Sequence, residues 1–140
     1  MKREIKFRGK PLGRYAHLEW IEGYYTGGDR PRIYGLDGVC SYDVDPETVC
    51  QDTGAKDKTG KEIYEGDVLK LIFKDKYSDL EMEGVVKFCQ DHLSFNCFDG
   101  TYPWGSPLGK WNISQMEIIG NVFDNPEYKE RFGRVFEDET

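Results

Sequence analysis

Long apolar runs, closely spaced cysteines and glycine-rich phosphate loops are all missing from this sequence of 140 residues. A membrane-spanning helix needs roughly 18 consecutive apolar residues, and a signal peptide needs an apolar segment after its charged start. The sequence has no such run, and its N-terminal MKREIKFRGK is charged. We therefore expect a cytoplasmic protein. The absence of a glycine-rich loop before a helix removes the main signature of nucleotide-binding α/β folds.

The cysteines are few and form no CxxC pair; they are Cys40, Cys50, Cys89 and Cys97. In a reducing compartment such cysteines act as small apolar side chains, so we expect no disulfides. Cys89, His92 and Cys97 offer three zinc ligands, but a structural zinc site needs a fourth. No motif selects a nucleophilic pair from the four cysteines and two histidines. We expect no metal, no cofactor and no catalytic residue.

Basic residues are outnumbered, since 19 Lys and Arg face 26 Asp and Glu, for a formal net charge of −7. This balance repels a phosphate backbone unless the basic groups gather on one face. The densest basic cluster lies near the N-terminus, where basic and apolar residues alternate as in a first strand with a solvated basic face. Two nucleic-acid roles stay open beside that interpretation. One is direct binding through Lys6, Arg8 and Lys10, and the other is acidic mimicry of DNA.

Aromatic residues and turn formers are plentiful: aromatics make up 14% of the chain, and 16 glycines are scattered without a period. Short strands, many turns and large aromatic side chains are typical of a mainly β domain, and the length fits one domain spanning residues 1–140. Alternating apolar residues predict strands at residues 4–9, 17–25, 32–36, 47–51, 67–73, 83–89, 93–98 and 116–123. The 67–73 strand is apolar on both faces, as in a strand covered on both sides. Residues 83–89 and 93–98 should form an antiparallel hairpin.

One short helix is predicted near the C-terminus. Asn125 can cap it, Pro126 suits its first position, and Gly133 can end it after about two turns. Tyr128 and Phe132 lie one turn apart, so we expect this helix to rest on the sheet through them. From about residue 134 we expect a disordered acidic tail.

The stretch GAKDKTGKEIYEGDVLKL, residues 54–71, combines turn formers, acidic side chains and an apolar run. Asp57 to Gly60 is typical of a turn, because aspartate bonds the backbone two residues on and glycine adopts positive φ. A second turn follows at residues 65–67. The acidic side chains are Asp57, Glu62, Glu65 and Asp67, and they lack the spacing of a calcium loop. We interpret the stretch as β scaffold and not as a catalytic loop or a metal site.

The same stretch carries a resemblance to a known family. KFRGK at residues 6–10, DPETVCQDTGAKDKTGKEIYEGDVLKL at 45–71, GVVKF at 84–88 and IIGNVFDNPE at 118–127 occur in an order similar to the YopX family of bacteriophage and prophage proteins. Trp20 followed by Gly23 fits the same order. The resemblance covers roughly residues 3–128. It implies a β-rich, antiparallel, barrel-like fold encoded by phage or prophage, with no established biochemical activity and no catalytic motif. Cys50 and residues 97–111 depart from the family pattern.

Residues 101–111, TYPWGSPLGKW, form a predicted loop of aromatics, glycine and proline. Tyr102, Trp104 and Trp111 are candidate partner-binding residues, because exposed aromatics on a rigid loop anchor protein partners. The alternative is that the tryptophans fold back as a lid on the barrel mouth. Base stacking is disfavoured, since only Lys110 accompanies them.

The sequence thus favours an accessory protein of phage or prophage that is not an enzyme and binds a phage or host protein, alone or as a homo-oligomer. A nucleic-acid-associated or DNA-mimicking protein is the alternative. The third class, a small enzyme, would need a deep pocket with converging acidic, histidine or cysteine side chains.

Overall fold

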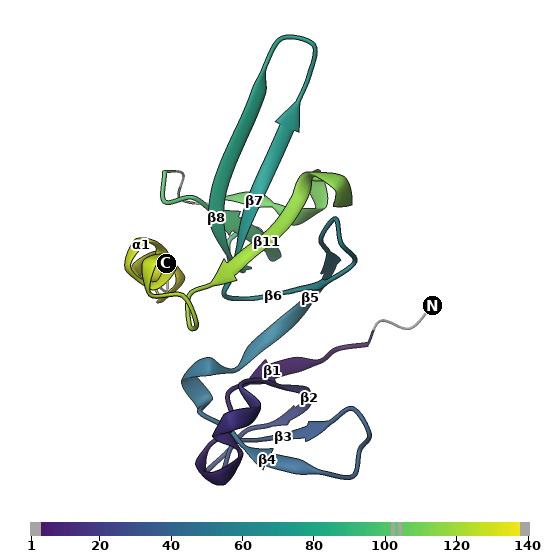
Figure 1. Cartoon of the computed structure of the whole chain (residues 1–140), viewed down its shortest axis with the longest axis vertical. Helices are drawn as coiled ribbons and strands as arrows, with labels where there is room; N and C mark the ends of the chain where they lie inside the picture. The colour runs from purple at the N-terminus through teal and green to yellow at the C-terminus, as the bar shows by residue number, and fades with distance from the viewer. Residues whose placement is uncertain (1–3, 102, 104, 138–140) are drawn as a thin grey trace. The chain divides into compact units, whose positions relative to one another are not determined.

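The computed structural model describes residues 4–101, 103 and 105–137. The backbone divides into two compact units, Met1–Gly54 and Ala55–Thr140. Both are built from antiparallel strands (Figure 1). The fold is therefore mainly β, as the sequence predicts.

The first unit is a sheet of short strands joined by tight turns. Its elements are β1 (Phe7–Gly9), the 3₁₀ turn η1 (Gly13–Leu18), β2 (Ile21–Thr26), β3 (Arg32–Gly35), β4 (Ser41–Asp43), the 3₁₀ turn η2 (Pro46–Thr48) and β5 (Cys50–Lys56). The strand order is β4-β3-β2-β1-β5, and β5 continues past Gly54 to pair with β6 (Glu62–Tyr64). Ile33, Val44 and Cys50 are buried in the core of this unit. A Cβ on Gly9 would lie only 3.0 Å from Ile33 Cδ1, so this core leaves little room for a side chain there.

The second unit is built on a five-stranded antiparallel sheet. Its strands are β7 (Asp67–Lys74), β8 (Asp79–Cys89), β9 (Ser94–Phe98), β10 (Ser106–Pro107) and β11 (Met116–Asn121), in the order β10-β9-β8-β7-β11. The 3₁₀ turns η3 (Leu108–Lys110) and η4 (Ile113–Gln115) precede β11, and helix α1 (Pro126–Glu137) follows it. A bulge interrupts the pairing of β11 between Ile118 and Gly120. Ile118 and Ile119 are neighbours along the strand, so they point to opposite faces of the sheet and pack into different apolar clusters.

This sheet is covered on both faces, because its strands alternate between two apolar clusters. One cluster is formed by Ile63, Leu69, Leu71, Val86, Cys97, Leu108 and Met116. The other is formed by Val68, Val85, Cys89, Phe98, Val122 and Phe132, with Tyr128, Val135 and Phe136 packed around it. Helix α1 therefore covers the second face of the sheet.

Most of the predicted elements are confirmed. The strand at 67–73, the 83–89/93–98 hairpin and the helix start at Pro126 are present. The helix does not end at Gly133, however, but continues to Glu137, because Val135 and Phe136 pack against the cluster beneath it. The strand predicted at 17–25 begins only at Ile21, after η1. Strands β4, β6 and β10 were not predicted.

Within the described residues the strands form open sheets and no closed barrel, so the barrel-like architecture is not confirmed. A search of the described helices finds none that combines the length and the apolar character needed to cross a membrane.

Candidate functional site

Glycines fix the two turns of the 54–71 stretch. Gly60 and Gly66 have φ angles of 87° and 86°, in the left-handed region that favours glycine, and Gly54, inside β5, has a φ of 85°. The Gly66 N–H donates to the Val86 carbonyl at 2.8 Å, and the Gly66 carbonyl accepts from the Val122 N–H at 3.0 Å. The turn at Gly66 therefore joins β8 to the segment that follows β11.

Asp57 is the buried hub of the same stretch, with 2% of its surface exposed. Its Oδ1 accepts the N–H groups of Thr59 and Lys61 at 2.9 and 3.0 Å and the Thr59 hydroxyl at 2.7 Å, while Oδ2 accepts the Ile118 N–H at 3.1 Å. Burial raises the pKa of this carboxyl, but the Thr59, Ile118 and Lys61 donors together outweigh burial and hold the pKa below its usual value of 3.8. The ionised carboxylate thus joins the 57–61 turn to β11, which agrees with the scaffold interpretation.

Asp67 has a similar structural task at the second turn. It is 2% exposed, and its Oδ2 accepts the Tyr64 N–H at 2.8 Å. Both oxygens of Asp57 and Oδ2 of Asp67 therefore accept backbone N–H groups, as turn and capping aspartates do.

The cysteine and histidine side chains that could suggest zinc do not converge. Cys89 and Cys97 lie in the clusters on opposite faces of the sheet, and His92 is exposed in the turn between β8 and β9. Burial, with a smaller contribution from the charge of Asp99, raises the pKa of the Cys97 thiol to about 12. A protonated, buried thiol is a poor nucleophile and a poor ligand. Over residues 4–101, 103 and 105–137, no three Asp, Glu, His or Cys side chains gather as a metal site requires.

The candidate nucleic-acid residues pack against a tryptophan. The Arg8 guanidinium lies 4.6 Å and the Lys10 ammonium 5.0 Å from the ring centre of Trp20, and Lys6 is only 9% exposed. The predicted solvated basic face is therefore wrong for this strand, because the aromatic ring attracts the charges and their aliphatic stems pack along apolar surface. A nucleic-acid role for these residues stays a prediction.

Two of the three candidate partner-binding aromatics, Tyr102 and Trp104, lie outside the described residues. Trp111 is half-buried against the cluster that contains Leu108, and its indole N–H donates to the Ser106 hydroxyl at 2.9 Å. Trp111 therefore packs on its own sheet, and its part in partner binding stays a prediction.

A depression of about 410 Å³ in the first unit is lined by Leu12, Arg30 and Asp43 among others. Arg30 Nε and Arg32 Nη1 donate to Asp43 Oδ1 at 2.9 and 2.8 Å. The Arg30 hydrogen bonds, joined by the charges of both arginines, outweigh partial burial and hold the pKa of Asp43 below its usual value. A carboxylate paired with two guanidinium groups is poorly suited to proton transfer at neutral pH.

One surface feature was not predicted: the β7–β8 hairpin continues beyond its neighbouring strands. β11 pairs with β7 up to Leu71, and β9 pairs with β8 from Val85 onward. Beyond these points, in the described part of the chain, residues 72–74 and 79–84 pair with no strand outside the hairpin itself. We call residues 72–81 the arm, which projects from the sheet of its unit in Figure 1.

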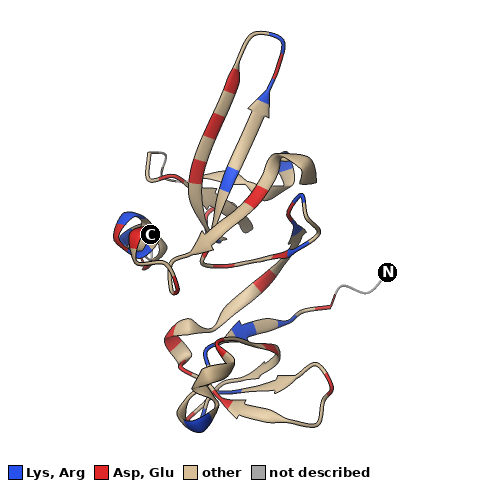
Figure 2. Ribbon diagram, in the orientation of Figure 1, with Lys and Arg blue, Asp and Glu red and all other residues tan. Residues whose placement is uncertain are grey.

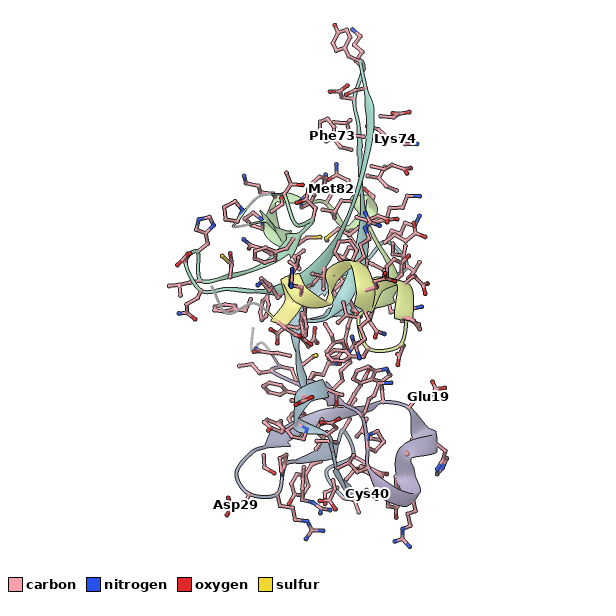
Figure 3. All side chains as sticks on the ribbon, turned by 90° about the vertical axis from the view of Figure 1, so that its left-hand side faces the viewer. Glu19, Asp29, Cys40, Phe73, Lys74 and Met82 are labelled. Carbon is pink, nitrogen blue, oxygen red and sulfur yellow. The ribbon has the colours of Figure 1, made fainter. Side chains whose placement is uncertain are left out.

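The arm has one apolar face and one charged face. Phe73 pairs with Leu80 on the same face as Leu71 and Met82. Phe73 is 40% exposed and Leu80 is 60% exposed. The other face carries Lys74, Asp79 and Glu81 beside Ile72, and Figure 3 shows Phe73 and Lys74 on opposite sides of the arm. Tyr77, in the turn, is 89% exposed. In the sequence, the alternation of Leu80, Glu81, Met82 and Glu83, ahead of the predicted 83–89 strand, was the available signal for the apolar face.

A sequence model of the YopX protein family matches residues 25–129. The chain belongs to the YopX family. The resemblance seen in the sequence is thus confirmed, although no curated protein matches this YopX chain. The matched range of the YopX chain includes the 54–71 stretch, the arm and the 101–111 loop, whereas Lys6, Arg8 and Lys10 lie outside it.

Proposed function

We propose that this YopX chain is a phage- or prophage-encoded accessory protein that acts in the host cytoplasm by binding another protein, and not as an enzyme. The observation that carries the proposal is the arm, whose Phe73, Tyr77 and Leu80 are exposed beyond the sheet. Aromatic and aliphatic side chains presented together on a projecting element are typical anchors of a protein interface.

The chemistry of the specific 54–71 stretch supports the same proposal. Asp57 and Asp67 accept hydrogen bonds from backbone N–H groups, and Gly60 and Gly66 have the positive φ that their turns require. Residues with such structural tasks explain the sequence pattern without a reaction. The surface outside this stretch is therefore where we place the function.

Two finer expectations stand as part of the proposal. Tyr102 and Trp104 of the 101–111 loop are further candidate partner contacts beside the arm. The second is a barrel-like closure of the sheet in the first unit. There an isolated bridge pairs Pro11 with Val44, and the Leu12 N–H donates to the Asp43 carbonyl at 2.9 Å. This bridge lies beyond the ends of β1 and β4, where closure of that sheet would occur.

The nucleic-acid alternative has one observation in its favour, the aromatic and basic cluster of Trp20, Arg8 and Lys10. Platforms for single strands combine such aromatics with a positive groove. Here the cations lie over the tryptophan ring, and Figure 2 shows acidic residues interspersed with basic ones along the ribbon. We therefore place protein binding first.

An affinity capture with the full tagged chain tests the proposal. Lysate of a host that carries the phage or prophage would be passed over the wild-type chain, over Leu80→Asp and over Leu36→Asp. Leu80 and Leu36 are 60% and 51% exposed, so the two variants change similar surface leucines, and only the first lies on the arm. We expect one defined partner at stoichiometric level with wild type and Leu36→Asp, and about tenfold less with Leu80→Asp, since a buried charge opposes an apolar contact.

Capture of the same partner in equal amount by all three chains would refute the arm as the binding surface. Turnover of a host metabolite by the purified chain, abolished by an Asp43→Asn substitution, would refute the non-enzymatic proposal.

A further inference from the structure

We infer that the turn at residues 57–61, which joins β5 to β6, is a guard that keeps the edge of β11 from pairing with a strand of another copy of this chain. The inference is independent of the arm and goes beyond the proposed function. β11 is the last strand of its sheet, and β7 is its one strand neighbour in the described part of the chain. An edge strand presents backbone N–H and C=O groups with which another chain can pair.

The guard occupies the backbone groups of this edge. The Lys58 N–H donates to the Met116 carbonyl at 2.8 Å, and Asp57 Oδ2 accepts the Ile118 N–H at 3.1 Å. Met116 and Ile118 are two residues apart on β11, so their backbone groups point to the same side of the strand. The guard therefore offers one donor and one acceptor, as a neighbouring strand would. The Asp57 carboxylate takes the place of a strand carbonyl.

The strand behind the guard has the composition of a segment that pairs with itself. Residues 118–123, IIGNVF, contain no charged residue and no proline, and most of them are β-branched or aromatic. Uncharged segments of this kind pair readily with copies of themselves when their edge is bare. Glu117 directly precedes the segment, and its Oε2 lies 3.1 Å from Lys58 Nζ. The guard is thus held by an ion pair at the point where the segment begins.

The opposite edge of the same sheet is protected in a different way. It is formed by β10, a strand of two residues, and the second of them, Pro107, has no N–H to donate. Short strands and prolines are common means by which proteins block sheet edges. Protection at both ends of the sheet supports a guarding task for the 57–61 turn in addition to its contribution to stability.

Sedimentation velocity and thioflavin fluorescence of the purified full chain test the inference. Asp57→Asn removes the acceptor for the Ile118 N–H, so we expect this variant to form large β-rich assemblies at least about tenfold faster than wild type. Val85→Ala is the control for lost stability, because it shortens a fully buried side chain of β8 and leaves the guard unchanged. It should assemble at the wild-type rate under conditions where all three chains are folded.

A matched pair of variants at Lys58 keeps the test decisive if Asp57→Asn does not fold. The Gly60 N–H donates to the Asp57 carbonyl at 2.9 Å, so Lys58 is the second residue of a four-residue turn, a position that favours proline. Lys58→Pro and Lys58→Ala both lose the ion pair with Glu117, but only Lys58→Pro also loses the N–H that donates to Met116. We expect Lys58→Pro to assemble faster than Lys58→Ala.

Amide hydrogen exchange locates the opened edge. In Asp57→Asn the Ile118 amide should lose protection, whereas the Val122 amide should keep it, because Val122 donates at 3.0 Å to the carbonyl of Gly66, which directly precedes β7. Equal assembly of Asp57→Asn and Val85→Ala would overturn the inference. So would wild-type assembly rates in both Asp57→Asn and Lys58→Pro.

Discussion

At the scale of single residues, the 54–71 stretch is explained by the geometry of its turns. Asp57 divides its two oxygens between separate tasks: Oδ1 serves the turn through Thr59 and Lys61, and Oδ2 reaches Ile118 on β11. An exposed aspartate elsewhere in the chain, Asp75, accepts all of its donors on Oδ1. The two aspartates therefore respond differently to replacement by asparagine.

Asp57→Asn should lower the free energy of unfolding by about 1 to 3 kcal/mol, because the amide presents N–H groups to the Ile118 N–H and leaves that buried donor unpaired. Asp75→Asn is the matched control and should have a much smaller effect, since its Oδ1 is retained. Urea denaturation monitored by tryptophan fluorescence measures both.

The same measurement at several pH values checks the charge of Asp57. Its pKa in the folded chain lies below the usual value of 3.8, so its contribution is complete above that value and disappears as pH falls through the lower, folded-state pKa. The difference in unfolding free energy between wild type and Asp57→Asn should therefore become smaller below about pH 4. A gap that widens in acid, or equal effects of the two substitutions, would contradict the assigned role.

Gly60→Val should also lower the free energy of unfolding by about 1 to 3 kcal/mol. Gly60 has a φ angle of 87°, and a Cβ there would meet no atom within 4 Å, so the penalty comes from the backbone conformation alone. A Cβ on Gly109 likewise meets nothing within 4 Å, but its φ is not positive, which makes Gly109→Val the control. Equal stability of wild type and Gly60→Val would refute the scaffold interpretation of this turn.

At the scale of elements, the arm and helix α1 both carry apolar side chains, but only those of α1 are covered by the sheet. The end of α1 is held by Val135 and Phe136 against the sheet, and Lys87 Nζ donates to the Val135 carbonyl at 2.8 Å. The arm has equally apolar residues, Phe73 and Leu80, but no described strand or helix covers them. The arm should therefore be dispensable for folding, whereas the packing of helix α1 on the sheet should not be.

A shortened chain tests this. Residues 73–80 would be replaced by Asn-Gly, which suits a two-residue hairpin turn between the cross-strand partners Ile72 and Glu81. We expect a native far-UV spectrum and a thermal midpoint within about 5 °C of wild type, with loss of partner capture. Phe132→Ala, in α1 at a position 1% exposed, should instead lower the free energy of unfolding by about 3 to 5 kcal/mol. Unfolding of the shortened chain would show that the arm belongs to the core.

An element could be predicted from the sequence where the local residue pattern determines its bounds, and not where tertiary contacts determine them. The two-sided strand of Val68 and Leu69 and the helix start at Pro126 follow from local pattern, and they were predicted. The extension of α1 past Gly133 follows from contacts of Val135 and Phe136, which no local rule contains. The arm was missed because alternation runs without a break from Leu71 to Phe73, so the sequence does not show where β11 stops pairing.

At the scale of the whole molecule, charge argues against a nucleic-acid role. The formal net charge is −7, and the densest basic cluster lies on the strand that packs against Trp20. Counterion release needs several cations along one track. The charge distribution therefore favours a protein partner over a phosphate backbone.

We expect no sequence-independent affinity for duplex or single-stranded DNA tighter than about 10⁻⁵ M near physiological salt. A fluorescence titration with labelled oligonucleotides at two salt concentrations measures it. Sub-micromolar, steeply salt-dependent binding that disappears when Lys6, Arg8 and Lys10 are neutralised would place the alternative function first.

The central claim, that this YopX chain works through a protein contact made by its arm, is tested most directly by amine crosslinking and mass spectrometry in host cells. The chain carries its own reporters: Lys74 and Lys76 in the arm, Lys110 in the 101–111 loop and Lys10 beside Trp20. The account predicts that intermolecular crosslinks concentrate on Lys74 and Lys76 and are lost in Leu80→Asp, which keeps every lysine. Intermolecular crosslinks on Lys110 or Lys10, with none on the arm lysines, would contradict it.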